Sequence, residues 1–243
     1  MVELSIIVPC RNDERRLPET IGSLNDVVTH SSLNVETLIV DDESADRTLE
    51  VAQELSAKYP AMRIRVFARK RLRRGFGSMV RYAMAYSNGR YCCLVSSDGH
   101  DPVALLPKFL QLLRNGAQLV QCTRYEREED YRVLPIKYRV YQAIYRQLTF
   151  WLLHEKITDT TYGFRAFDRI YIQALGTSSA RFDICPEITY KVLLGGGKIE
   201  FVPGSVKAVD RGGSVKFQLA HEIWGYGYVL LRAGLHRVGL KWF

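Results

Sequence analysis

Residues 92–102 read Cys92-Cys93-Leu94-Val95-Ser96-Ser97-Asp98-Gly99-His100-Asp101-Pro102. The segment starts as an apolar run with the length of a buried strand and then changes abruptly to small, acidic and turn-forming residues. Ligands of open α/β sheets bind where such strands end. The side chains of Asp98, His100 and Asp101 can hold a divalent cation, or a water, against a phosphate. The alternative is a polar turn in which Asp101 caps the next helix and Pro102 begins it.

The residues before this segment form the same kind of strand end twice. Leu4 to Pro9 and Val35 to Val40 are apolar runs typical of buried parallel strands, and helical spacing follows each at 16–28 and 44–55. A polar loop follows the first run, and the acidic cluster 41–46 follows the second. Because parallel strands end at one edge of a sheet, we expect these groups to converge on a nucleotide. A solvated acidic turn is the alternative.

A third strand, predicted at 64–67, leads into the most basic segment of the chain, residues 69–74. Gly75-Phe76-Gly77-Ser78 follows and opens a helix predicted to reach Tyr86. Cations beside a glycine turn at a helix N-terminus predict a cradle for a diphosphate. A solvated basic loop or a nucleic-acid patch is the alternative.

Composition limits the class of partner. The 243 residues are 47% apolar and 25% charged, as in ordinary soluble globular proteins, and the formal charge of +8 calls for nucleic acid, anionic lipid or a phosphorylated substrate. The five cysteines lack metal-ligand spacing and indicate reduced thiols of a cytosolic protein. We find no signal peptide and no apolar stretch of about 18 residues. We therefore expect a protein that touches a membrane at most.

The second half continues the alternation of strands and helices. Strands are predicted at 119–122 and 198–202, and helices at 102–116, 134–154, 183–194 and from 218 onward. This order predicts an α/β fold: one domain with a doubly wound, mostly parallel sheet flanked by helices. Helix 134–154 mixes aromatic and cationic residues, which is typical either of a packed core helix or of one at a membrane interface. The aromatic and basic tail 218–243 favours a peripheral membrane contact.

Several motifs of the chain resemble those of the family 2 glycosyltransferases, which have the GT-A fold. The resemblance is nearest to the branch of dolichol-phosphate or polyprenyl-phosphate mannose and glucose synthases, and it covers nearly the whole chain. In the first half the similar motifs are Val8-Pro9 with Asn12 and Glu14, Val40-Asp41-Asp42 with Ser44, Asp46 and Thr48, Gly75-Phe76-Gly77-Ser78, and Ser96-Ser97-Asp98. In the second half they are Thr123-Arg124-Tyr125, Thr158 to Arg165, helix 183–194 with Glu187, and Val209 to Lys216.

Three departures from the family pattern stand out. Ser96 replaces the first aspartate of the Asp-X-Asp motif, Tyr162 replaces a small residue before Gly163, and the spacing between Arg211 and Lys216 is one residue shorter. The first departure leaves Asp98 as the metal ligand for Mg²⁺ or Mn²⁺, with His100 or Asp101 as an alternative second ligand. Replacement of the metal by the cations of residues 69–74 is the third option.

The resemblance implies an inverting transfer of a hexose from a nucleoside diphosphate sugar, GDP-mannose or UDP-glucose, to a polyprenyl phosphate at the cytoplasmic face of a membrane. Asp42 with Asp13 or Glu14 would hold the base and ribose. The donor-binding residues expected are Pro9, Asn12, Glu14, Asp42, Ser44, Arg74, Gly75, Gly77, Ser97 and Asp98. The acceptor-binding residues expected are Arg124, Lys137, Thr161, Gly163, Arg165, Glu187, Arg211, Ser214 and Lys216. The catalytic residues expected are Asp98, Asp159 and Arg211, with Asp159 as the base if the acceptor is a sugar hydroxyl.

We expect a GT-A domain at 1–217, with a nucleotide-sugar half at 1–116 and an acceptor half at 117–217, followed by the tail 218–243. Two alternatives stay within the family: transfer to a sugar hydroxyl of a glycan or glycolipid, and a silent relative that binds sugar nucleotide without turnover. A nucleic-acid-binding protein would explain the charge. It is disfavoured because acidic clusters at the strand ends would repel phosphates.

Overall fold

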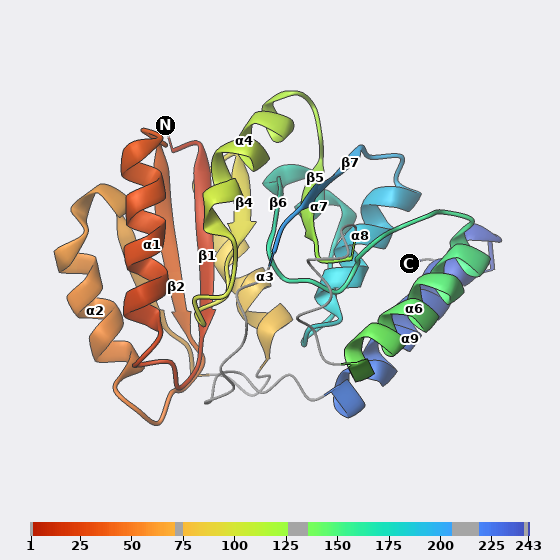
Figure 1. The fold of residues 1–243 in the computed structure, drawn as a ribbon, viewed down its shortest axis with the longest axis horizontal. Coiled ribbons are helices and arrows are strands. Elements are labelled where there is room, and N and C mark those ends of the chain that lie inside the picture. The colour runs from red at the N-terminus through yellow and green to blue at the C-terminus, as the bar shows by residue number, and fades with distance from the viewer. Residues whose placement is uncertain (1, 71–74, 126–135, 206–218, 241–242) are drawn as a thin grey trace.

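The computed structural model describes residues 2–70, 75–125, 136–205, 219–240 and 243. Within them, one seven-stranded sheet has the order β3-β2-β1-β4-β6-β5-β7 (Figure 1). Its strands are β1 (Leu4–Cys10), β2 (Val35–Asp41), β3 (Ile64–Ala68), β4 (Tyr91–Leu94), β5 (Leu119–Thr123), β6 (Arg165–Asp168) and β7 (Ile199–Pro203).

The sheet is mostly parallel, as predicted. β1 pairs in parallel with β2 on one side and with β4 on the other, and all seven residues of β1 are buried. β6 lies antiparallel between β4 and β5, while β5 pairs in parallel with β7. Strands buried on both faces need nearly continuous apolar runs. This explains why β1 and β2 are rich in β-branched residues and do not alternate between apolar and polar side chains.

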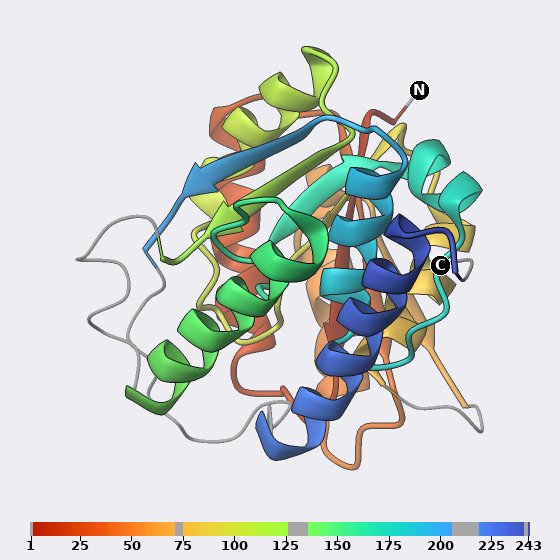
Figure 2. The ribbon, with the colours of Figure 1, turned by 90° about the vertical axis from the view of Figure 1, so that its right-hand side faces the viewer.

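Helices cover both faces of the sheet. The α-helices are α1 (Leu17–His30), α2 (Thr48–Lys58), α3 (Phe76–Tyr86), α4 (Leu106–Arg114), α6 (Ile136–Leu153), α7 (Arg169–Leu175), α8 (Ile184–Leu194) and α9 (Leu219–Arg237), and short 3-10 turns are η1 (Pro60–Met62) and η2 (Val103–Leu105). α1, α2 and α4 pack on one face, and α3, α7 and α8 on the other. α6 and α9 lie side by side at one end of the molecule, where they pack against α8 (Figures 1 and 2).

Each face has its own apolar core. On α1, Leu17, Ile21 and Leu24 are fully buried at helical spacing, and α3 contributes Val80 and Ala83 to the other face. A fully buried Leu or Ile side chain contributes about 1.5–3 kcal/mol relative to an exposed one, so these two stripes fix both helices on the sheet.

Most predicted elements are present, with differences that have local causes. α2 begins at Thr48 rather than Ser44, because Asp46 accepts a hydrogen bond from the Thr48 amide (3.0 Å) and holds residues 44–47 as a turn. The helix predicted over 102–116 is divided into η2 and α4. β6 and α7 were not predicted. Within the described residues, no helix is both long enough and apolar enough to cross a bilayer.

Candidate functional site

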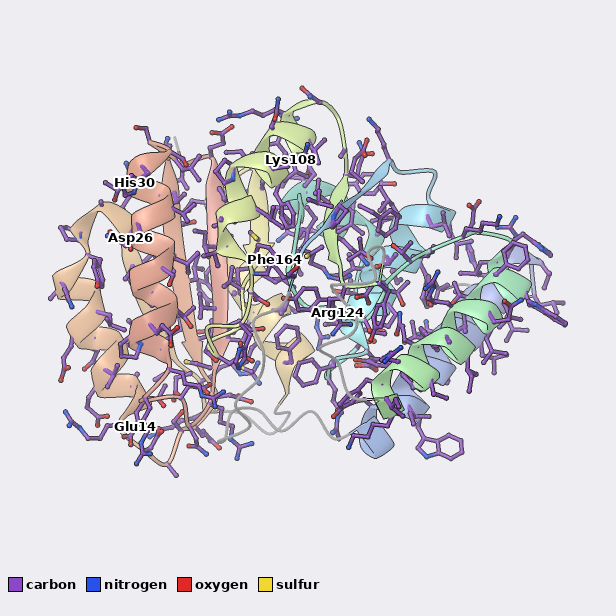
Figure 3. The ribbon with its side chains drawn as sticks, viewed as in Figure 1. Glu14, Asp26, His30, Lys108, Arg124 and Phe164 are labelled. Atoms are coloured by element: carbon purple, nitrogen blue, oxygen red, sulfur yellow. The ribbon has the colours of Figure 1, made fainter. Side chains whose placement is uncertain are left out.

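The polar loops after β1, β2 and β4 meet at the edge where these strands end. Glu14, in the loop after β1, lies toward this edge, whereas His30 and Lys108 lie toward the opposite one (Figure 3). The Glu14 amide donates to Asp46 (3.3 Å), and the Arg47 amide donates to Glu14 (3.0 Å). The loops after the first two strands are therefore tied together, as the convergence argument requires.

Asn12 and Ser44, two expected donor-binding residues, hold each other. The Asn12 amide donates to Ser44 Oγ (2.9 Å), and the Ala45 amide donates to Asn12 Oδ1 (2.7 Å). Asn12 has a φ of 56°, a left-handed conformation that asparagine tolerates better than most residues. Pro9 lies one residue before the end of buried β1. The motif residues thus build the shape of this edge.

Asp13 links all three strand ends. Its carboxylate is buried and accepts from Ser97 Oγ (2.7 Å) and the Arg11 amide (3.0 Å), while its own amide donates to Thr48 (2.8 Å). Burial raises the pKa of Asp13. In the part of the chain that the structure describes, its buried Oδ1 has no hydrogen-bond partner. An acceptor in this position can receive a hydroxyl of a bound ribose.

Asp42 and the glycine turn contact each other directly. Asp42 is buried, accepts from the Gly75 amide (3.0 Å) and lies 3.3 Å from Arg69 Nε. A Cβ at Gly75, whose φ is 130°, would lie 2.5 Å from the carbonyl oxygen of Ala180. A Cβ at Gly77 would come equally close to the carbonyl of Ser179.

The same segment occupies the amides at the start of α3. Gly77 donates to the Arg181 carbonyl (3.1 Å) and Ser78 to the Ala180 carbonyl (3.0 Å). Close packing of residues 179–181 therefore explains both glycines, and their contact with a diphosphate stays a prediction. Arg74 lies outside the described residues.

The turn after β4 brings its carboxylates close together but uses them differently. Asp98 is half-buried and accepts from the His100 amide (3.2 Å). Asp101 is buried and accepts from the Ser96 amide and from the Tyr162 hydroxyl, both at 2.6 Å. Burial, and then the negative charge of Asp98, raise the pKa of Asp101 to about 6. The imidazole of His100 lies 3.5 Å from the guanidinium of Arg16.

These residues can hold a divalent cation only if the substrate supplies further ligands. Within the described ranges, no group of three His, Cys, Asp or Glu side chains is placed to hold a metal. Asp98 offers a half-exposed carboxylate and Ser96 a neutral hydroxyl, while both oxygens of Asp101 are engaged. Mg²⁺ is commonly bound by one or two carboxylates together with substrate phosphates. Asp98 and a diphosphate together meet that requirement, and the ion would neutralise charge on the leaving diphosphate.

Arg124, labelled in Figure 3, forms an ion pair with the buried Asp159 in the second half. Arg124 Nε donates to Asp159 Oδ2 (2.7 Å), and Nη2 donates to Asp159 Oδ1 (3.1 Å) and to Thr161 Oγ1 (3.0 Å). Burial works to lower the pKa of Arg124, but the Asp159 carboxylate outweighs it and raises that pKa. Asp159 is fully buried and also accepts from the amides of residues 161 and 162. This arrangement favours the positioning of Arg124 over proton abstraction by Asp159.

Arg165 and Glu187 were expected to bind acceptor, and the structure places both in the interior. The guanidinium of Arg165 is fully buried and donates to Thr189 and to the carbonyls of Thr160, Tyr162 and Cys185. Glu187, also fully buried, accepts from the amides of residues 178 and 179. Each side chain satisfies its charge with backbone and hydroxyl groups of the interior, and its contact with an acceptor stays a prediction.

The remaining expected acceptor residues are only partly described. Lys137 is exposed at the start of α6, and Thr161 and Gly163 are half-buried beside the ion pair. Arg211, Ser214 and Lys216 lie outside the described residues, so their assignments stay predictions.

Tyr162 is a site residue that sequence analysis noted only as a departure from the family motif. Its hydroxyl contacts Asp101, and its ring centroid lies 4.5 Å from the guanidinium of Arg124. The signal in the sequence was the bulk of Tyr162 at a position where the family carries a small residue.

Curated relatives are similar to part of this chain. A dolichol-phosphate mannosyltransferase of Pyrococcus furiosus is 32% identical over 124 residues, which are 51% of this chain and 34% of that protein. A dolichyl-phosphate beta-glucosyltransferase of Dictyostelium discoideum is 32% identical over 103 residues, 40% of this chain and 31% of that protein. The chain thus spans about a third of the length of these two relatives.

A solved structure shares the fold. Glucosyl-3-phosphoglycerate synthase from Mycobacterium tuberculosis, in complex with Mn²⁺, UDP and phosphoglyceric acid, gives a TM-score of 0.71 at 20% identity, covering 99% of this chain and 80% of that one. This likeness confirms the predicted GT-A fold. The family model described as "Glycosyl transferase family 2" matches residues 5–176, a span from β1 to the end of α7. The chain therefore belongs to glycosyl transferase family 2.

Proposed function

We propose that this protein is a glycosyltransferase and moves a hexose from GDP-mannose or UDP-glucose to a polyprenyl phosphate at the cytoplasmic face of a membrane, with inversion. The relatives differ in acceptor: two are named for dolichol phosphate, whereas the solved neighbour acts on phosphoglycerate. One observation favours the lipid. The outward surface of α6 and α9 carries many exposed apolar side chains.

The exposed face of α6 carries apolar residues that a helix surrounded by water would be expected to bury. Its outward positions include Ile144, which is 57% exposed, and Trp151, which is 70% exposed. Its inward positions include Gln142 and Thr149, which are buried. The whole outward stripe, at a spacing of three to four residues, is Ile136, Val140, Ile144, Leu148 and Trp151. A helix that exposes such a stripe needs an apolar partner.

α9 extends this surface. Trp224 is 82% exposed, and Tyr228 and Leu231 are exposed on the same side one and two turns later. α6 and α9 lie side by side (Figure 2), and a Cβ at Gly234 of α9 would lie 3.4 Å from Leu152 of α6. We call the outward faces of these two helices the α6–α9 surface.

The charges around the α6–α9 surface favour an anionic bilayer over a protein partner. Lys137, Arg146 and Arg237 are exposed on these helices. Glu222, an acidic residue of α9, is buried and paired with Arg181 at 2.7 Å. Each exposed cation contributes about 1 kcal/mol near an anionic leaflet. Aromatic and aliphatic groups flanked by cations are typical of helices that lie in the membrane interface.

The polar site is compatible with a phosphate acceptor. A phosphate is already an anion at neutral pH, so it needs positioning rather than a general base. Arg124 offers a guanidinium held by Asp159, and the exposed Lys137 can approach the same anion. In the proposed step, a phosphate oxygen attacks the anomeric carbon on the face opposite the diphosphate. The bond from that carbon to the diphosphate oxygen breaks, and its electron pair leaves with the nucleoside diphosphate.

A transfer assay with two acceptors tests the proposal. We expect label from GDP-mannose or UDP-glucose, with Mn²⁺, to enter the lipid phase of anionic vesicles that contain polyprenyl phosphate. Transfer to soluble phosphoglyceric acid instead would contradict the lipid acceptor. Binding of the sugar nucleotide without any transfer would favour a silent relative, the alternative that Ser96 raised.

A matched pair of variants tests the α6–α9 surface. Ile144→Ser should lower vesicle binding by about fivefold to thirtyfold, since each lost apolar side chain contributes about 1–2 kcal/mol at an interface. Ile170 on α7 is equally exposed, at 58%, and lies outside the α6–α9 surface. Ile170→Ser should therefore bind vesicles like the wild type. Equal partitioning of both variants would remove the argument for a bilayer.

A further inference from the structure

Tyr162 is a large residue where the resembled motif has a small one, and its side chain is almost completely buried. It lies in the loop between α6 and β6, shortly after Asp159, which pairs with Arg124. The two ends of this side chain contact different parts of the site, so the question is what each contact does.

The hydroxyl reaches the turn after β4. It donates to Asp101 Oδ1 at 2.6 Å, and the other oxygen of the same carboxylate accepts from the Ser96 amide at 2.6 Å. Asp101 therefore holds the start of the turn that carries Asp98, and the hydrogen bond from Tyr162 holds Asp101 in position. A charge-assisted hydrogen bond of this length is among the stronger ones in proteins.

The ring reaches Arg124. The guanidinium lies 4.5 Å from the ring centroid, within the range of a cation–π contact. The backbone of Tyr162 contributes as well, because its amide donates to Asp159 Oδ1 at 3.3 Å. Asp159 in turn holds Arg124 through two hydrogen bonds. The ring and the amide thus fix the position of Arg124 from two directions.

We propose that Tyr162 is a positioning residue that couples the donor-side turn 96–101 to the acceptor-side Arg124. This inference rests on the proposed function, since it assigns the turn to the sugar nucleotide and Arg124 to the acceptor phosphate. Because the hydroxyl acts on one substrate and the ring on the other, substitutions can separate the two effects.

Two variants make the separation. Tyr162→Phe keeps the ring and removes the hydroxyl, so the dissociation constant of UDP or GDP with Mn²⁺ should rise by about fivefold to tenfold, the size of one hydrogen bond. Its KM for polyprenyl phosphate should stay within about twofold of the wild type. Tyr162→Leu removes both contacts and should raise the nucleotide constant and the acceptor KM together.

Tyr145→Phe is the matched control. Tyr145 is also buried and donates its hydroxyl to a backbone carbonyl, that of Tyr226, at 3.1 Å. It contacts neither the turn nor Arg124 through any of its hydrogen bonds, so both constants should match the wild type. The thermal midpoints of all variants are recorded beside the binding data. A merely structural role for Tyr162 would lower the midpoint without moving nucleotide binding selectively.

The proposal is overturned if nucleotide binding is unchanged in Tyr162→Phe, or if it falls only as much as in Tyr145→Phe. A Phe variant whose acceptor KM rises as much as its nucleotide constant also overturns it. Failure of the proposed function has a different signature. The wild type would then bind nucleotide but transfer nothing to polyprenyl phosphate, and the nucleotide measurements would still test the hydroxyl.

Discussion

The two halves of this molecule differ in the large apolar side chains that they expose. In residues 2–116, α1 buries Leu17, Ile21 and Leu24 and exposes polar residues such as Glu19 and Asp26. In residues 117–240, Arg165, Glu187 and Gln121 are fully buried, while α6 and α9 expose their apolar faces. The first half is built like an ordinary soluble α/β protein. Both halves bury charged side chains within an apolar interior. Among the described residues, the first half exposes one large apolar side chain, Tyr86, whereas the second half exposes the apolar residues of α6 and α9, which indicates that the surroundings of this surface differ from water.

Arg165→Leu should have the largest effect and tests the buried guanidinium of the second half directly. The substitution leaves the carbonyls of Thr160, Tyr162 and Cys185 without a buried donor, and we expect a loss of at least about 4 kcal/mol in the free energy of unfolding. Denaturant titration measures it. Ile7→Val, in the fully buried β1, is the counterpart in the first half and should cost only about 0.5–1.5 kcal/mol. Similar losses in the two variants would mean that the buried guanidinium of Arg165 stabilises the second half no more than a single methyl group of β1 stabilises the first.

Sequence patterns predicted the first half well because its signals are local. β1, β2 and β4 are apolar runs that stop at polar turns, and parallel pairing then brings the turns together. The convergence of these turns could therefore be predicted from the sequence pattern. The links through Asp13 and Tyr162 could not, because they join residues 84 and 61 positions apart in the chain.

The second half was harder to predict because its organisation is long-range. β6 has four residues and exists through antiparallel pairing with β4 and β5. Arg165 is the first residue of this strand. Its guanidinium suggested an anion-binding site, because the burial of Arg165 cannot be deduced from the residues next to it in the sequence. For α6, periodicity predicts a stripe of apolar residues but not which face points inward. The structure shows that the apolar stripe points outward, which the two sequence-based alternatives had left open.

Arg124→Ala should have the next largest effect and separates the acceptor side from the donor side. Asp159 would remain fully buried without the guanidinium that pairs with it, so we expect a loss of about 3 kcal/mol in stability. The KM for polyprenyl phosphate should rise by at least about tenfold, while sugar-nucleotide binding stays within about twofold. Calorimetry and initial rates measure these quantities. If the variant loses nucleotide affinity to the same degree, Arg124 does not act on the acceptor alone and its assignment is wrong.

Asp42→Asn tests the donor side with a smaller expected effect. Loss of a charged acceptor at the strand end should weaken sugar-nucleotide binding by about 1.5–3 kcal/mol. Glu36→Gln is the control, because Glu36 is a buried carboxylate near the opposite end of the same strand. It accepts from Ser5 (2.7 Å) and Asn88 (2.6 Å), so its substitution should lower stability and leave nucleotide affinity unchanged. If the two variants bind nucleotide equally well, Asp42 serves the fold and not the donor.

Ser96→Asp should give the smallest effect, and it tests the position where the first half departs most from the family. The variant places a second carboxylate beside Asp98. On the same turn, burial and then the charge of Asp98 already raise the pKa of the buried Asp101. Without metal, the added charge should lower the thermal midpoint. With Mn²⁺ and nucleotide, the ion gains a second anionic ligand, so half-maximal donor binding should need about threefold to tenfold less Mn²⁺.

Ser96→Asn is the control for this change, because it adds the same bulk without the charge. It should neither lower the metal-free midpoint as far nor reduce the Mn²⁺ requirement. Asp98→Ala should lose the Mn²⁺ response altogether, since Asp98 is the carboxylate that the turn offers to a diphosphate-bound ion. If EDTA leaves donor binding and turnover of the wild type untouched, Asp98 does not hold a metal. The positive charge needed to stabilise the leaving diphosphate must then come from cationic side chains.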